Sequence, residues 1–140
     1  PTPSSLYSKV RALTSLPPPT PTLIATDVDG TLIPKYEHGP NPAAVETLRR
    51  VRGKGIKWVL ATGKSRKGAI DSLVEGLGGM EREELEGMDG VFLQGLMVWK
   101  DGKVIYERKV PNDVVTRVEE MCARLGVEVV GYDGDDIWCR

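Results

Sequence analysis

The sequence predicts an α/β protein, a parallel β-sheet with helices on its faces. From residue 22 onward, short apolar runs alternate with stretches in which apolar residues recur at the helical period. Polar residues directly follow two of these runs, as they do at the ligand-binding edge of such a sheet. The 140 residues are enough for one domain with a single core. Because parallel strands need long crossovers, usually helices, the alternation indicates this class.

The first half of the predicted fold is strand, helix, strand and helix. A buried strand over Leu23–Val28 comes first, and the helix after it has Asn41 as N-cap and Pro42 as its first residue. A second buried strand covers Ile56–Ala61. The apolar faces of the two helices comprise Ala44, Val45, Leu48 and Val51 before Gly53, and Ala69, Ile70, Leu73, Val74 and Leu77 before Gly78-Gly79.

The second half adds further strands and one more helix. We expect the acidic segment Met80–Asp89 to be exposed and Val91–Leu93 to form a third strand. Asp101-Gly102 marks the turn of a hairpin. A third helix begins near Asp113 and ends before Gly126, and strands follow over 128–132 and from 136 to the last residue. The apolar face of this helix comprises Val114, Val115, Val118, Met121, Cys122 and Leu125.

Composition restricts the class of protein further. Residues 1–21 contain six of the ten prolines and predict a disordered leader or linker. The leader also faintly resembles an organelle transit peptide, so targeting is the alternative to a cytoplasmic location. No apolar run approaches the roughly 18 residues that a membrane-spanning helix needs. Cys122 and Cys139 fit no metal or disulfide pattern and indicate free thiols in a reducing compartment.

Charge is divided unevenly along the chain. Residues 1–70 carry 11 Lys/Arg and 4 Asp/Glu, whereas residues 71–140 carry 8 and 16. The basic half is therefore the one that we expect to bind an anion. The alternative is that its charges form a solvated polar face. An isoelectric point near 5.9 argues against a nucleic-acid partner.

The first chemical motif is Thr26-Asp27-Val28-Asp29-Gly30. In an extended strand, residues two apart share a face, so Asp27 and Asp29 project together. Gly30 allows a sharp turn directly after them and lets the backbone approach a bound phosphate. Asp27 can attack a phosphoryl group, and Asp29 can protonate the leaving group and later accept a proton from water. Two carboxylates facing a phosphate imply Mg²⁺, bound by Asp27 and Asp29. A surface turn or a calcium loop is the alternative.

The second motif is Thr62-Gly63-Lys64, which follows the second strand and precedes a helix. A hydroxyl, a free glycine amide and a helix start form a cradle for phosphate. We expect Thr62, Gly63 and Lys64 to bind it, whereas Arg66 and Lys67 either add charge or are solvated. The pattern is not a nucleotide-binding P-loop, because Trp58 stands where that motif needs a glycine.

These two motifs resemble those of the haloacid dehalogenase (HAD) superfamily, and their spacing resembles its Cof-type phosphatases over residues 22–140. The resemblance implies a Rossmann-like core and magnesium-dependent hydrolysis of small phosphorylated metabolites through an aspartyl phosphate. It assigns Asp27 as nucleophile and metal ligand. It assigns Asp29 as acid/base and backbone metal ligand, and Thr62 as phosphate ligand.

The chain departs from the family pattern in several places. Relatives commonly have Thr-Gly-Arg at Thr62-Gly63-Lys64 and Asn-Gly at Gln94-Gly95. After Leu93 the family has a cap domain, then a lysine motif and an acidic motif; Gly134-Asp135-Asp136 only superficially resembles the acidic one. We therefore expect residues 22–109 to be the first part of an incomplete HAD core and 110–140 the start of an α+β cap domain.

Two expectations follow for these 140 residues. They should be poorly active as a phosphatase, and apolar edge surface around Val91–Leu93 should stay exposed. The alternative function is a non-catalytic module that binds phosphate or a partner.

Overall fold

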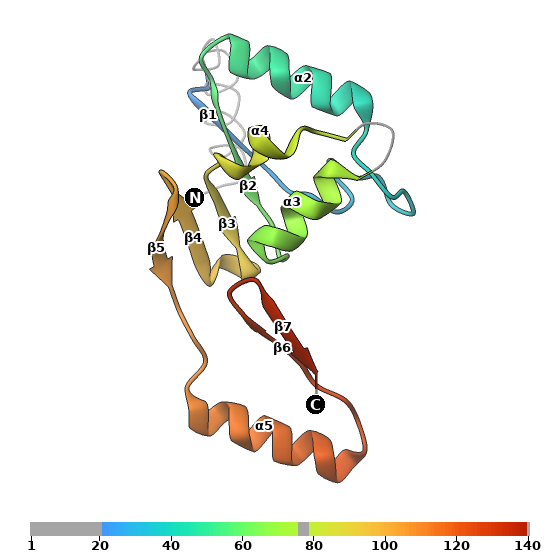
Figure 1. The fold of residues 1–140 in the computed structure, drawn as a ribbon, viewed down its shortest axis with the longest axis vertical. Helices are drawn as coiled ribbons and strands as arrows, with labels where there is room; N and C mark the ends of the chain where they lie inside the picture. The colour runs from blue at the N-terminus through green and yellow to red at the C-terminus, as the bar shows by residue number, and fades with distance from the viewer. Residues whose placement is uncertain (1–20, 76–78, 140) are drawn as a thin grey trace, which may run out of the picture.

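The computed structural model describes residues 21–75 and 79–139 (Figure 1). The predicted leader, residues 1–21, lies outside this part of the chain except for Pro21, and so do Leu77 and Gly78. None of the helices in the described ranges combines the length and apolarity that crossing a membrane requires. Cys122 and Cys139 are free thiols.

A five-stranded mixed sheet forms the centre of the fold. Its first three strands are parallel and its last two antiparallel, and they lie side by side in chain order. The parallel strands are β1 (Leu23–Thr26), β2 (Lys57–Ala61) and β3 (Gly90–Phe92). The antiparallel strands are β4 (Met97–Lys100) and β5 (Lys103–Glu107). Asp101 and Gly102 have φ of 51° and 78°, so the predicted Asp-Gly hairpin turn joins these two strands.

Three helices form a layer on the sheet: α2 (Pro42–Gly53), α3 (Arg66–Val74) and α4 (Arg82–Glu86). Ion pairs link them, from Arg52 of α2 to Glu84 of α4 at 2.7 Å and from Arg82 of α4 to Asp71 of α3 at 2.7 Å. Because β1, β2 and β3 follow one another in a single direction, right-handed crossovers place α2 and α3 on the same face.

The strands are accordingly less buried than the sequence predicts. Trp58 and Leu60 of β2 face the helices and are buried, whereas Val59 between them is half-buried. In β1, Ala25 is exposed and Leu23 is 50% exposed. The prediction of a buried first strand was wrong, because described helices cover one face of the sheet and no described strand pairs with the outer side of β1.

The ends of α2 and α5 (Asn112–Leu125) are confirmed, whereas α3 ends at Val74 with an extended Glu75, before the predicted stop at Gly78-Gly79. Asn41 caps α2 by accepting a hydrogen bond from the backbone N–H of Ala43 at 2.9 Å. The segment Met80–Asp89, predicted to be exposed, contains α4 and contributes apolar side chains to the core. Its charged residues are exposed or half-buried, whereas its apolar residues Met80, Leu85 and Met88 are buried. The described core comprises Val28, Leu32, Ile33, Val45, Leu48, Trp58, Leu60, Ala69, Ile70, Leu73, Met80, Leu85, Met88, Phe92 and Met97.

The predicted exposed edge at Val91–Leu93 was also wrong. Strand β3 lies between β2 and β4, and its Phe92 is 1% exposed. The antiparallel return of β4 onto β3 covers the edge that was expected to be open. Among the described strands, β1 and β5 form the two edges of the sheet.

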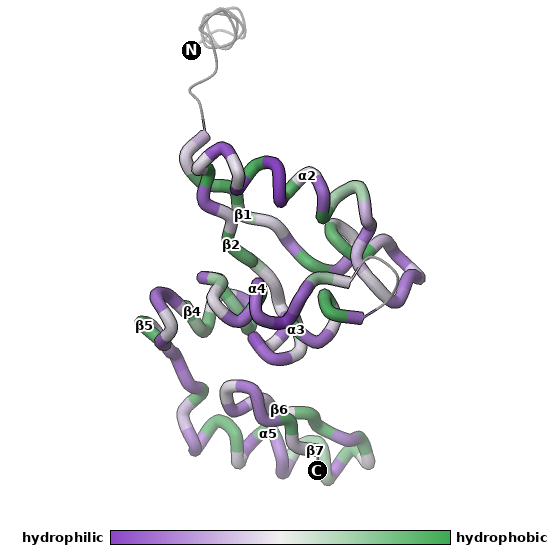
Figure 2. Tube along the Cα trace, turned by 45° about the horizontal axis from the view of Figure 1, so that its top comes forward, coloured by the Kyte–Doolittle hydropathy of each residue, from purple (hydrophilic) through white to green (hydrophobic). Residues whose placement is uncertain are grey.

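The last part of the chain forms a separate layer beyond the sheet (Figure 1). It contains α5 (Asn112–Leu125) and a hairpin of β6 (Val130–Asp133) and β7 (Asp136–Cys139). Gly126 ends α5 with φ of 66°, as its position in the sequence predicts. Hydrophobic and hydrophilic residues alternate along α5 (Figure 2), but no described residue of this helix is buried. The predicted apolar face exists without a described segment that covers it.

An ion pair at the amino ends of the strands offers a test of this packing. Lys57 at the start of β2 contacts Asp89 at 2.5 Å, and Asp89 Oδ1 also accepts a hydrogen bond from the backbone N–H of Asp101 at 2.9 Å. The hydrogen bond from Lys57 holds the pKa of Asp89 below its usual range.

We predict that Asp89→Asn lowers the free energy of unfolding by about 1 kcal/mol at pH 7, because a charge-assisted hydrogen bond is lost. Since the pKa of Asp89 is lower in the folded state, its stabilisation is present above the unfolded pKa of about 3.9 and is lost as pH falls through the folded pKa. The difference in Tm between the two proteins should therefore narrow from about pH 6 to pH 3. A difference that stays constant over this range would contradict the assignment.

Candidate active site

The carboxyl ends of three parallel strands meet at one edge of the sheet. Thr26 is in register with Leu60, and Ala61 with Val91, so β1, β2 and β3 end side by side. The loops that follow them bring together residues 27–30, 62–64 and 93–95. Both sequence motifs therefore lie at the edge where parallel sheets bind ligands.

The loop after β1 is built around Val28. The Val28 side chain is completely buried, and its carbonyl oxygen accepts hydrogen bonds from the N–H groups of Leu32 and Ile33, both at 2.9 Å. Asp27 and Asp29, on either side, are exposed. The strand ends at Thr26, so a turn, rather than the strand that the sequence predicts, carries the two carboxylates.

Gly30 makes this turn possible. Its φ is 76°, a left-handed conformation that glycine adopts without strain, and its N–H donates to the Ile33 carbonyl at 2.7 Å. No described atom lies near the position that a Cβ would take. Among the described residues, the backbone conformation and not a close neighbour accounts for glycine at this position.

The loop after β2 is fixed by backbone hydrogen bonds. Thr62 is 8% exposed, and its hydroxyl oxygen accepts a hydrogen bond from the Lys64 N–H at 3.3 Å. The Thr62 N–H donates to Val91 at 3.0 Å, and the Lys64 carbonyl accepts from Leu93 at 3.0 Å. Gly63 is exposed between these two residues. The second loop is thus held against β3 and the turn that follows it.

One contact brings the two motifs together. The Lys64 ammonium lies 3.3 Å from Oδ2 of Asp29, and both side chains are partly exposed. Residues 35 positions apart in the sequence are thereby joined at the sheet edge. A ligand at this edge meets two carboxylates and one cation from neighbouring loops.

The other two cations of the second motif have structural contacts. The Arg66 guanidinium stacks over the Trp99 ring at 4.2 Å and donates to the Glu86 carbonyl. Lys67 pairs with Asp71 at 2.7 Å. Basic residues of the first half also pair with acidic residues of the second half elsewhere, as in the contacts of Arg49, Arg52 and Lys57 with Glu84 and Asp89. Part of the charge difference between the two halves of the chain is therefore neutralised by ion pairs within the fold.

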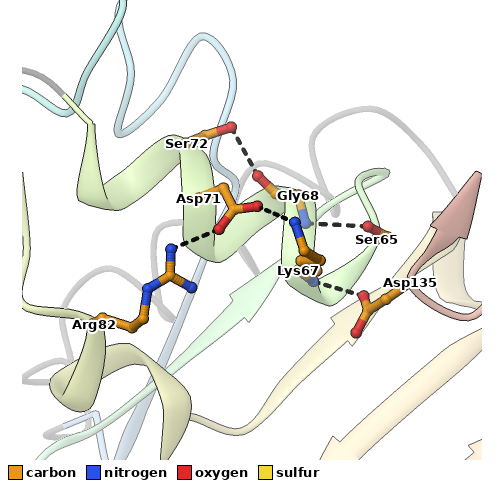
Figure 3. Close-up of polar contacts among 7 residues, drawn as sticks. All are labelled: Ser65, Lys67, Gly68, Asp71, Ser72, Arg82 and Asp135. Atoms are coloured by element: carbon orange, nitrogen blue, oxygen red, sulfur yellow. Dashed lines mark hydrogen bonds and ion pairs between the residues drawn. The ribbon is translucent and has the colours of Figure 1, made fainter.

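The start of α3 is tied to the hairpin of β6 and β7 (Figure 3). The Ser65 hydroxyl caps the helix by accepting from the Gly68 N–H at 3.1 Å. The amide of Lys67, in the first turn of the helix, donates to Oδ1 of Asp135 at 2.6 Å. Asp135 lies in the hairpin turn, so the last layer of the chain reaches the same sheet edge as the two motifs. The sequence assigned no role to Ser65, although serine before a helix start is a common cap.

The carboxylates fit part of a magnesium site. Asp27 Oδ1 accepts from the Val28 N–H at 2.7 Å, and Asp27 and Asp29 are both exposed. Within residues 21–75 and 79–139, no three potential metal ligands of the His, Cys, Asp and Glu types gather. Mg²⁺ is commonly bound by one or two carboxylates together with water and phosphate oxygens, so two exposed carboxylates are compatible with it.

The described chain also has a cavity of about 360 Å³ at the opposite end of the sheet. Lys57, Trp58 and Asp89 are among its lining residues, and Lys57 and Asp89 already neutralise each other. The two sequence motifs do not contribute to its lining. The candidate active site is therefore the exposed strand edge and not this cavity.

A mixed sheet with a helical layer and acidic residues after its first strand defines an α/β core with a candidate ligand-binding edge. A sequence profile of haloacid dehalogenase-like hydrolases matches residues 24–140, and the chain belongs to this family. A HAD/Cof-like hydrolase from Plasmodium vivax superposes with a TM-score of 0.71 at 19% identity, covering 84% of this chain and 42% of that one. A sugar phosphatase of HAD subclass IIB superposes with a TM-score of 0.66 at 23% identity, covering 86% and 44%.

One curated relative shares more sequence over a shorter stretch. The chloroplastic endoribonuclease YBEY of Arabidopsis thaliana is 39% identical over 93 residues, which cover 65% of this chain and 16% of that protein. The chain thus spans less than half the length of the solved structures it matches, and the match covers a small part of this relative. The Cof-type family and the HAD core fold that the sequence predicted are confirmed.

We predict that Asp135→Ala frees the hairpin from α3, because the amide of Lys67 then loses its acceptor. Hydrogen exchange of the Lys67 amide should become several-fold faster, which NMR can measure directly. Asp136→Ala is the matched control, since it removes a neighbouring carboxylate outside this contact. Equal exchange rates in the two variants would show that Asp135 does not hold the hairpin.

Proposed function

We propose that this chain is part of a magnesium-dependent phosphatase of small phosphorylated metabolites that acts through an aspartyl phosphate. The contact between Lys64 and Asp29 is the observation that carries the proposal, because it joins the acidic motif to the phosphate cradle at 3.3 Å. Membership in the HAD-like hydrolases supports the same chemistry.

In the first step, a carboxylate oxygen of Asp27 attacks phosphorus and the ester P–O bond breaks. The leaving alkoxide takes a proton from the Asp29 carboxyl, so the products are an alcohol and a phosphorylated Asp27. Exposure of Asp27 beside the buried Val28 supports the nucleophile, since its side chain is directed to solvent and held by a short turn.

In the second step, water attacks the phosphorus of the aspartyl phosphate. Asp29, now ionised, takes the proton from that water, and the bond between phosphorus and Asp27 breaks. Inorganic phosphate leaves and both carboxyl groups return to their starting states. One residue thus serves as acid and then as base, as two consecutive steps at one site require.

The phosphate oxygens are bound by groups from both loops. We assign the Thr62 hydroxyl, the backbone amide of Gly63 and the Lys64 ammonium to this role. Gly30 contributes by letting the backbone approach the phosphate, since its own N–H already donates to Ile33. The buried position of Thr62 supports its role, because a fixed hydroxyl orients a ligand at small entropic cost. Lys64 offsets charge that two carboxylates and a phosphate would otherwise concentrate.

Mg²⁺ fits the oxygen-rich edge, with the Asp27 carboxylate and the backbone carbonyl of Asp29 as its ligands from this chain. When bound, the ion neutralises charge on the phosphoryl group and polarises its oxygens. The remaining positions would be filled by water, by phosphate oxygens or by residues outside these 140.

The class of substrate and the domain organisation are part of the proposal. One of the superposing structures is that of a sugar phosphatase, which makes phosphorylated sugars and similar metabolites the substrates to test first. Residues 22–109 are assigned to the first part of the core and 110–140 to the start of a cap. A chloroplastic relative supports an organelle as the alternative to the cytoplasm. The near-neutral net charge supports a partner other than nucleic acid.

We predict that this chain binds beryllium fluoride with Mg²⁺, because the complex mimics a phosphoryl group on an aspartate. Bound fluoride should give new ¹⁹F NMR signals that disappear without Mg²⁺ and in Asp27→Asn. Thr62→Val should weaken binding by about 10-fold through loss of one hydrogen bond to an anion. Signals that survive Asp27→Asn would contradict the nucleophile assignment.

A non-catalytic module that only binds or stores phosphate is the rival function. We expect the isolated 140 residues to hydrolyse substrate slowly, because the family's lysine motif is not among them. Loss of one electrostatic group at such a site costs on the order of 100-fold or more in rate. Labelling with acetyl phosphate separates the two functions. A label on Asp27 that persists equally long in the wild type and in Asp29→Asn favours the rival, whereas a label that is lost faster from the wild type than from Asp29→Asn favours the phosphatase, because Asp29 is the base for the second step.

A further inference from the structure

We propose that Gln94 is a specificity-determining residue whose carboxamide hydrogen-bonds the alcohol half of a hydroxylated phosphate ester. This inference rests on the proposed function, because it requires a phosphate ester at the cradle. Three observations carry it: the backbone of the turn after β3, the position of the Gln94 side chain, and its unused hydrogen-bonding capacity.

The turn after β3 has an unusual backbone. Leu93, Gln94 and Gly95 have φ of 52°, 58° and 89°, so three consecutive residues are left-handed. Glycine adopts this region freely, whereas leucine and glutamine do so at an energetic cost. Glycine or asparagine would form the same turn with less strain. Strained conformations of this kind concentrate at functional sites, where the surrounding structure imposes them.

The surroundings of the turn impose the conformation from both sides. The Leu93 N–H donates to the Lys64 carbonyl at 3.0 Å, and the Leu96 N–H donates to the Leu93 carbonyl at 3.1 Å. Phe92, directly before the turn, is in the core. The turn is therefore anchored to the phosphate cradle and to the core, and the backbone direction at Gln94 is fixed.

This backbone places the Gln94 carboxamide against Gly63. A Cβ at Gly63 would overlap Nε2 of Gln94 and lie 3.0 Å from its Cδ. Gly63 has no left-handed φ, so the contact, and not the backbone conformation, accounts for glycine at this position. The amide group thus lies directly beside the residue whose N–H we assign to phosphate.

The carboxamide is also available to a ligand. Gln94 is exposed, and no hydrogen bond among the described residues uses its side chain. A free carboxamide offers two N–H donors and one carbonyl acceptor. A hydroxyl group can both donate and accept, so it matches this pair of functions.

The order of the strands indicates which part of a substrate reaches Gln94. Neighbouring strands are about 4.8 Å apart, so the ends of β1, β2 and β3 are three successive positions along the edge. The phosphoryl group belongs between the Asp27 and Thr62 loops, at the first two positions. Gln94 occupies the third, where the alcohol half of a larger ester extends. Polyol and sugar phosphates have hydroxyl groups there, and simple alkyl phosphates do not.

Binding to three probes tests the inference on the 140-residue chain with Mg²⁺. Calorimetry would give the Kd of glucose 6-phosphate, of ethyl phosphate and of orthophosphate for the wild type, Gln94→Ala and Gln94→Gly. We expect both variants to lose about 3- to 10-fold in affinity for glucose 6-phosphate, the range for one neutral hydrogen bond. Their affinity for ethyl phosphate and orthophosphate should stay within about twofold of the wild type, because neither probe has an alcohol hydroxyl for the carboxamide.

The two variants also separate recognition from a structural role. Gln94→Gly removes the backbone strain together with the carboxamide, so its Tm should equal or exceed that of the wild type while the sugar phosphate still binds less tightly. Equal losses for all three probes, or no loss for glucose 6-phosphate, would overturn the role of Gln94. A wild type that fails to bind even orthophosphate would overturn the proposed function itself, and this inference with it.

Discussion

The parallel pairing of β1, β2 and β3 is the constraint on which the rest of the structure depends. It aligns Thr26 with Leu60 and Ala61 with Val91, so three strands end at one edge and deliver their loops to it. The same strand order sends α2 and α3 to one face, where they form the core with β2 and β3. Charged residues lie at the strand ends because burying them in the interior of the sheet would cost free energy. Strand order therefore determines the position of the candidate site more than any single residue does.

Burial of Val28 converts this arrangement into a pair of exposed carboxylates. Its side chain enters the core while its carbonyl oxygen holds the returning chain, which leaves Asp27 and Asp29 directed outward. Lys64 from the next loop contacts one of them, and the Asp135 turn reaches the same edge from the last layer. Three segments that are distant in the sequence thereby share one electrostatic environment.

The sequence predicted what depends on local chemistry. Asn41 before Pro42, Asp101-Gly102 and Gly126 identify a helix start, a hairpin turn and a helix end, because each signal acts over a few residues. It failed where the outcome depends on distant partners. Periodicity shows that Leu23–Val28 can form a strand, but it does not show that β1 is an edge strand with one face open. The same limit applies to the site: the two motifs were visible in the sequence, whereas the tether of Asp135 to α3 and the placement of Gln94 beside Gly63 arise from contacts between distant segments.

Backbone NMR with Mg²⁺ and orthophosphate shows whether the carboxyl edge of the sheet is the anion site of this chain. We expect the amide signals of Asp29, Gly30 and Gly63 to shift together, with one common Kd. Those of Lys57 and Asp89, at the far cavity, should stay in place. Shifts confined to the far cavity, or spread evenly over exposed lysines, would contradict this placement of the anion site.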